Sequence, residues 1–201
     1  ARPIRKSDIE VPAAGGNMAV MEASSGSLYT TMTHEAPLVT GGLVASDVSR
    51  DILKIVVVNR YRAQRPQVAF VRGFGLTSGA LASSVAHDSH NIVAVGVHDE
   101  DICAAVNLVV ERGGGLALAG GGVADCLELP IAGLMSPLDG WEVAARYARL
   151  RDGARSMGSP MADPFITLSF MCLLVIPELK LGDKGLFDVT AFSFTSLWSG
   201  R

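Results

Sequence analysis

Ile52-Leu53-Lys54-Ile55-Val56-Val57-Val58 is a short, almost uninterrupted apolar run around which the fold can be argued. It is dense in β-branched residues and too short for a typical buried helix, so it predicts a buried β-strand. Three basic residues follow this strand, and they are expected to lie in solvent where the strand ends: Arg60, Arg62 and Arg65.

Strands and helices are predicted on the C-terminal side of this run. Residues 67–72 alternate in polarity before the turn at Gly73-Phe74-Gly75, and residues 92–97 form another apolar run, so both predict strands. Asp99 is a candidate N-cap for a helix that ends near Gly113, because apolar residues recur after it at helical spacing.

The second half of the chain adds a hairpin and a longer helix. Gly120-Gly121-Gly122 separates residues 116–119 from 123–129, which is typical of a β-hairpin. Apolar residues from Val143 to Met157 recur at steps of four and three and predict an amphipathic helix. Residues 187–198 are expected to be a strand. The apolar stretch 163–176 matches neither the periodicity of a helix nor that of a strand. The predicted fold class is therefore α+β, with a mixed, largely antiparallel sheet and two main helices packed on it.

Residues 1–45 are predicted to form an N-terminal arm, and residues 46–201 the main α+β domain. Within the arm, Asn17–Glu22 and Leu28–Thr33 are strand-like segments on either side of a Ser- and Gly-containing turn, so a β-hairpin is expected there. The break at Gly41-Gly42 supports the boundary.

Composition limits the classes of function. The chain has 201 residues, 49% of them hydrophobic and 18% charged, with a net charge of −3, which argues against disorder and against a nucleic-acid partner. The apolar run 168–177 is too short to span a membrane, so a cytoplasmic protein without a membrane partner is expected. The three cysteines have no C-x-x-C spacing and are expected to be buried free thiols.

The densest polar cluster is Ser83-Ser84-Val85-Ala86-His87-Asp88-Ser89-His90-Asn91, expected as an irregular segment between two strands. Imidazole and carboxylate groups on such a loop can serve as acid, base or metal ligand. The alternative is that they cap the strand ends and bond their own loop backbone. A Ser84/His87/Asp88 triad is disfavoured, because triad members normally converge from separate segments.

Two blocks give the chain a family resemblance: residues 82–92, which contain His-Asp-Ser-His-Asn, and residues 129–136, Leu-Pro-Ile-Ala-Gly-Leu-Met-Ser. With Asp51–Ile55, Gly73–Leu76, Asp163–Phe165 and Val175–Leu181, in the same order, the chain resembles the C-terminal domain of bacterial and archaeal adenine deaminases of the amidohydrolase superfamily. The resemblance covers residues 51–194.

The resemblance implies a role in purine metabolism: hydrolytic deamination of adenine to hypoxanthine and ammonia, with a divalent metal (manganese, iron or zinc) held in a (β/α) barrel. No His-x-His occurs here, and 201 residues are fewer than the roughly 250 of such a barrel. The isolated chain is therefore expected to be inactive without a barrel domain or subunit. The alternative is an autonomous, noncatalytic domain for small-ligand binding or oligomerisation, and homo-oligomer formation is expected from the apolar content.

Under the resemblance, the residues expected to line the purine site are His87, Asp88, Ser89, His90 and Asn91. His87 and His90 are also candidate metal ligands.

Overall fold

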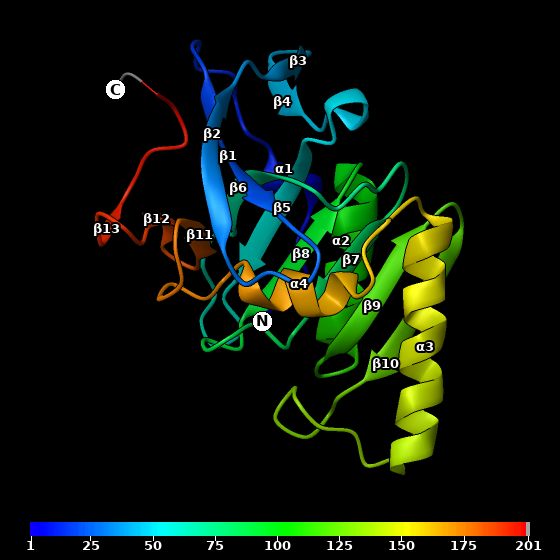
Figure 1. The fold of residues 1–201 in the computed structure, drawn as a ribbon. Coiled ribbons are helices and arrows are strands. Elements are labelled where there is room, and N and C mark those ends of the chain that lie inside the picture. Colours follow the sequence, from blue (N-terminus) through cyan, green and yellow to red (C-terminus); the bar gives the residue numbers. More distant parts are fainter. Residues whose placement is uncertain (200–201) are drawn as a thin grey trace.

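The computed structural model describes residues 1–199 and is built around one eight-stranded sheet (Figure 1). All neighbouring strands are antiparallel except β1 and β6, which are parallel, so the predicted α+β fold with a mixed, largely antiparallel sheet is confirmed. In spatial order the strands are β10 (Val123–Glu128), β9 (Gly115–Gly120), β7 (Ala80–Ser83), β8 (Ile92–Gly96), β5 (Leu53–Val58), β6 (Gln67–Arg72), β1 (Met18–Ala23) and β2 (Thr30–Glu35).

Helices and small sheets surround this central sheet. The helices are α1 (Lys6–Ile9), α2 (Asp99–Glu111), α3 (Gly140–Ser156) and α4 (Pro164–Phe170), with a 3-10 turn at Val48–Arg50. Strands β3 (Leu38–Thr40) and β4 (Leu43–Ala45) form a hairpin, and β11 (Leu179–Gly182), β12 (Gly185–Asp188) and β13 (Ser193–Phe194) form a second antiparallel sheet.

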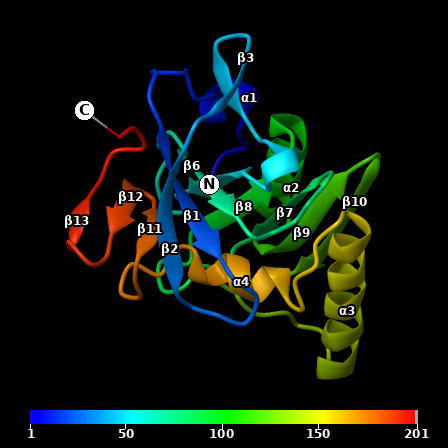
Figure 2. The same ribbon diagram turned by 45° about the horizontal axis from the view of Figure 1, so that its top comes forward.

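Strand β5 is buried along its whole length because both faces of the sheet are covered. Leu53, Ile55 and Val57 belong to the apolar cluster that includes residues of α3 and α4. Val56 and Val58 belong to the cluster on the opposite face, where α2 packs. The two main helices therefore lie on opposite faces of the sheet (Figure 2).

The hairpin predicted within residues 1–45 is present as β1 and β2. Its first strand pairs in parallel with β6, so the hairpin extends the main sheet. The division of the chain at residue 45 stays a prediction.

Three local expectations need correction. The irregular segment expected from Ser83 to Asn91 begins inside a central strand, because Ser83 is the last residue of β7. The small residues of β7 allow close packing: a Cβ on Gly96 would lie 2.5 Å from the Cβ of Ala80. The N-cap of α2 is His98, so Asp99 is the first helical residue. The expected strand 187–198 is interrupted, since the Asp188 carboxylate accepts a bond from Ala191 N and turns the chain.

Among residues 1–199, no helix combines the length and the apolar character that crossing a bilayer requires. The three thiols are free: Cys103 and Cys172 are buried as expected, while Cys126 is half-buried. Burial raises the pKa of Cys103 and Cys126 to about 11, which leaves these thiols protonated and unreactive at neutral pH.

Candidate functional site

The polar loop is residues 84–91, between β7 and β8. Ser84, at its start, is buried; its hydroxyl donates to Gly133 O at 2.6 Å and accepts from Gly115 N at 2.8 Å. His87 N donates to Ser169 O at 3.0 Å, which ties the middle of the loop to α4. The loop is therefore fixed to its neighbours through its backbone, and several of its side chains remain free.

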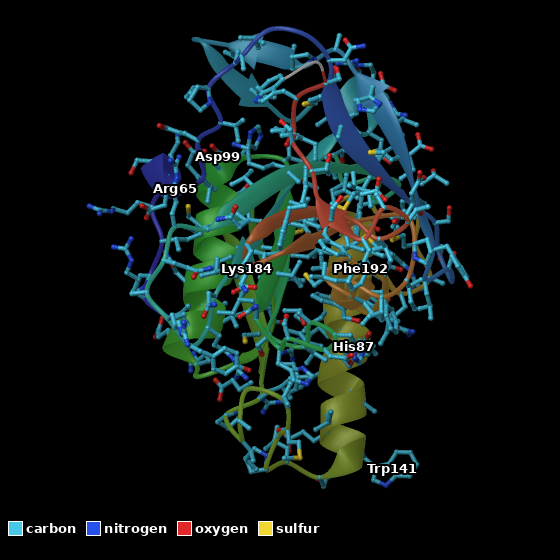
Figure 3. All side chains as sticks on the ribbon, turned by 90° about the vertical axis from the view of Figure 1, so that its left-hand side faces the viewer. Arg65, His87, Asp99, Trp141, Lys184 and Phe192 are labelled. Atoms are coloured by element: carbon cyan, nitrogen blue, oxygen red, sulfur yellow. The ribbon has the colours of Figure 1, made fainter. Side chains whose placement is uncertain are left out.

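His87 and Asp88 lie at the outer side of this loop. The His87 ring stacks on Phe170 with centroids 4.8 Å apart, and its side chain is 37% exposed (Figure 3). The Asp88 side chain is 85% exposed, and its Oδ1 lies 3.9 Å from His87 Nδ1. Both groups are thus available at the surface to a ligand or to another part of a larger protein.

The other three predicted residues have different environments. Ser89 is exposed, and its carbonyl oxygen accepts a bond from the Tyr61 hydroxyl at 3.3 Å. His90 has φ of 50°, and its buried Nδ1 has no hydrogen-bond partner among the described residues. Asn91 is buried, and its Oδ1 accepts from Arg60 N at 3.1 Å, so its side chain supports the loop.

The assignment of His87 and His90 as metal ligands stays a prediction. Their ring centroids are 6.4 Å apart, and residues 1–199 contain no group of three or more His, Cys, Asp or Glu side chains that could hold an ion. Protein zinc sites use three or four such ligands. A site that used His87 and His90 would therefore need a further ligand from outside residues 1–199.

A surface hollow of about 480 Å³ opens beside the loop and is lined by Arg60, Tyr61, His90, Ala132 and Leu134. It brings the His-Asp-Ser-His-Asn block next to the Pro-Ile-Ala-Gly-Leu-Met-Ser block, which are far apart in the sequence. Of the predicted residues, His90 lines this hollow.

Arg60 connects the two blocks, and sequence reasoning missed it. Its Nη1 donates to Ala132 O at 2.6 Å, and its Nη2 donates to the Tyr61 hydroxyl at 3.1 Å. The expectation that Arg60 is simply solvated is wrong, although Arg62 and Arg65 are exposed. No local pattern distinguishes Arg60 from these two, because its partners come from a distant loop.

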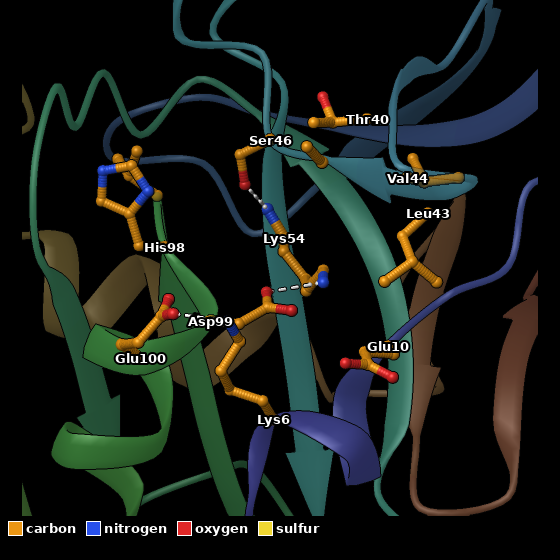
Figure 4. A pocket seen from close by; sticks show the side chains of 12 residues that line it. Lys6, Glu10, Thr40, Leu43, Val44, Ser46, Lys54, His98, Asp99 and Glu100 are labelled. Atoms are coloured by element: carbon orange, nitrogen blue, oxygen red, sulfur yellow. Dashed lines mark hydrogen bonds and ion pairs between the residues drawn. The ribbon is translucent and has the colours of Figure 1, made fainter.

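A second cavity, of about 210 Å³, lies at the start of α2 (Figure 4). Lys54, 2% exposed, donates from Nζ to Asp99 Oδ1 at 2.6 Å and to Ile9 O at 3.2 Å. At the rim, Lys6 and Glu100 form another ion pair, which raises the pKa of Lys6 and lowers that of Glu100 mainly through their hydrogen bond. These charges are paired, and the contacts tie the N-terminal segment to β5 and α2.

Comparison with known proteins identifies a family whose match includes both blocks. The family model described as "Adenine deaminase C-terminal domain" matches residues 27–193, so the match begins upstream of the resemblance seen in the sequence. The chain is 52% identical to an adenine deaminase from Methanosarcina barkeri over 96% of its own length. It is 52% identical over 96% to one from Salinibacter ruber, and 42% identical over 97% to one from Methanothermobacter thermautotrophicus.

The chain spans 36% of the length of each of these three relatives. What is shared is thus one domain of a longer protein, and the family match covers most of the present chain. The chain belongs to the adenine deaminase C-terminal domain family.

Proposed function

We propose that this chain acts as the C-terminal domain of an adenine deaminase, which hydrolyses adenine to hypoxanthine and ammonia only together with polypeptide outside these 201 residues. The relatives that support this are named adenine deaminases, and their matching part is about a third of their length. The metal-dependent chemistry would belong to the remaining two thirds, and residues 1–199 contain no group of three or more His, Cys, Asp or Glu side chains that could hold the ion alone.

The observation that carries the proposal is the position of loop 84–91. Its backbone is anchored at Ser84 and His87, while the His87 and Asp88 side chains reach the surface. A loop fixed in this way can present polar groups to a neighbouring domain at little entropic cost, because its backbone is already ordered.

In the whole enzyme, the polar loop would line or cap the purine site. Imidazole, carboxylate and hydroxyl groups can donate to and accept from the nitrogen-bearing edge of a purine. Ser89 would contribute through its exposed hydroxyl, and Asn91 by holding the loop against Arg60. The role of this chain is thus to bind and orient the base and to limit access of water.

A chimaera tests the proposal. In the Methanosarcina barkeri relative, the matching 36% would be replaced by this chain, and ammonia release from adenine would be measured. We expect the chimaera to be active. We expect the isolated chain to release no ammonia with added manganese, iron or zinc.

Within the chimaera, a His87→Ala/His90→Ala double variant is expected to lower kcat/KM at least about tenfold, equivalent to about 1.4 kcal/mol of lost transition-state stabilisation. His34→Ala is the matched control, because His34 is exposed on β2, away from the loop. A folded but inactive chimaera, or equal activity of the two variants, would contradict the proposal.

The alternative is an autonomous domain for ligand binding or self-association. Trp141, 89% exposed at the start of α3, is the kind of apolar side chain that an oligomer interface buries (Figure 3). An inactive chimaera together with a dimeric mass for the isolated chain, which Trp141→Ser converts to a monomeric mass, would favour this alternative.

A further inference from the structure

We propose that the hollow beside loop 84–91 binds an uncharged planar heterocycle, and that the ring of Tyr61 is the surface on which this ligand stacks. The choice of adenine as the first probe rests on the proposed function; the site itself rests on the geometry of the hollow. Its volume of about 480 Å³ lies within the roughly 300–1,000 Å³ typical of small-molecule sites.

Tyr61 is exposed and yet held in place. Its ring is 64% exposed, which is unusual for a side chain whose polar end is bonded on both sides. The hydroxyl accepts from Arg60 Nη2 at 3.1 Å and donates to Ser89 O at 3.3 Å. An aromatic face fixed in advance loses little freedom when a ligand stacks on it, so these bonds favour binding.

Arg60 extends the stacking surface. Its guanidinium carbon lies over the Tyr61 ring, 5.1 Å from the centroid, so a planar cation and a planar ring are layered. The guanidinium also donates to Ala132 O and to the Tyr61 hydroxyl. The layering of the guanidinium on the Tyr61 ring favours a planar aromatic ligand, which would continue the same stack.

The remaining walls agree with this ligand class. Ala132 and Leu134 supply apolar surface, and His90 supplies a polar group. Arg60 Nε and His90 Nδ1 are buried and have no hydrogen-bond partner among the described residues. Unpaired buried nitrogens are rare in folded proteins, and both belong to residues that line the same hollow. A ligand in the hollow could bond to either nitrogen after an adjustment of the loop that exposes it.

Binding is tested on the isolated chain by ligand-observed NMR titration with adenine and hypoxanthine. Cyclohexanol, which is uncharged and not planar, is the control ligand. Tyr61→Leu is expected to weaken adenine binding at least about fivefold, from the free energy of about 1 kcal/mol or more that base–aromatic stacking contributes. Tyr29→Leu is the matched control variant, since Tyr29 is 66% exposed at another surface and should leave binding unchanged.

Tyr61→Phe distinguishes the contribution of ring stacking from that of the two hydrogen bonds that hold the ring in place. It keeps the aromatic face but removes the bonds to Arg60 and Ser89, so we expect weakening smaller than that of Tyr61→Leu. No adenine binding at millimolar ligand, equal binding of cyclohexanol, or the same loss in Tyr29→Leu would overturn the proposal.

The binding titration and the chimaera assay test the two proposals independently. An active chimaera with no adenine binding to the isolated chain would reject this site and leave the proposed function intact. Tyr61-dependent binding with an inactive chimaera would support the site and reject the proposed function.

Discussion

The guanidinium of Arg60 fills the space in which a side chain at Gly133 would begin. A Cβ on Gly133 would lie 1.6 Å from Arg60 Nη1, the atom that donates to Ala132 O. Gly133 also has φ of 74°, a region that favours glycine. The contact between the two sequence blocks therefore depends on the absence of a side chain at position 133.

Gly133→Ala is expected to destabilise the protein more than Gly113→Ala. Gly113 has nearly the same φ, 75°, but open space around it, so the control reproduces the backbone strain without the clash. We expect an additional cost of about 1 kcal/mol, because Arg60 must give up its bond to Ala132 O. Urea denaturation gives both values. In an Arg60→Ala background the two glycine substitutions should cost the same; a persistent difference would show that Arg60 is not the cause.

Tyr147 and Asp163 join α3 to the start of α4. The Tyr147 hydroxyl donates to Asp163 Oδ1 at 2.5 Å, and the same oxygen accepts from Ile166 N at 3.1 Å as the helix cap. Burial, and then this hydrogen bond, raise the pKa of Tyr147. Tyr147→Phe should cost about 1 kcal/mol in thermal or urea unfolding, and Asp163→Ala about 2 kcal/mol because the cap is lost as well. An equal loss of stability in the two variants would mean that the cap of α4 contributes nothing.

The central strands and the two long helices could be predicted because their signals are local. The apolar run 52–58 and the helical spacing of residues 143–157 survive as β5 and α3 within a few residues. Segment 163–176 could not be assigned, since the polarity of its residues does not follow their burial: α4 buries Thr167 and Ser169 but leaves Ile166 exposed. Strand β7 could not be predicted because Ala80-Leu81-Ala82-Ser83 does not show the alternation typical of a strand. Its position is determined by packing against β8, β9 and α2.

The composition of the sequence predicts the polar loop but does not predict its geometry. Histidine density points to residues 87 and 90. Which of them lines a hollow depends on Arg60 and on the loop at Ala132, which accepts the Arg60 bond and lies 72 residues from Arg60 in the sequence. Long-range contacts of this kind leave no periodic trace in a single sequence.

The buried ion pair between Lys54 and Asp99 predicts that replacing Asp99 lowers the stability more than replacing Lys54. Lys54 has a 3% exposed side chain, whereas that of Asp99 is 19% exposed. Asp99→Ala leaves a buried ammonium group without its counter-charge and should cost about 3 kcal/mol. Lys54→Met removes the buried charge and keeps most of the volume, so it should cost clearly less. Urea denaturation of both variants decides this, and an equal or larger cost for Lys54→Met would contradict it.

Lys180 predicts a pH dependence of stability with a definite sign. It is fully buried in β11, its Nζ donates to Leu28 O at 2.8 Å, and burial lowers its pKa from 10.5 to about 8. The folded protein therefore releases this proton before the unfolded chain does. The cost of burying the charge is complete below about pH 8 and is relieved as pH rises from about 8 to 10.5, so this group makes the protein more stable in that window.

Lys180→Met removes the titrating group and also its electrostatic effect on Cys172. Burial raises the pKa of the Cys172 thiol to about 12, so the contribution of Cys172 to stability falls as pH rises above 9 and opposes that of Lys180. The free energy of unfolding of Lys180→Met relative to the parent should decrease by about 2 kcal/mol between pH 7 and pH 10, as the parent loses its buried charge. Urea denaturation at several pH values gives this difference. If it stayed constant with pH, Lys180 would have an ordinary pKa in the folded state, and its burial would have to be compensated by a group other than the Leu28 carbonyl.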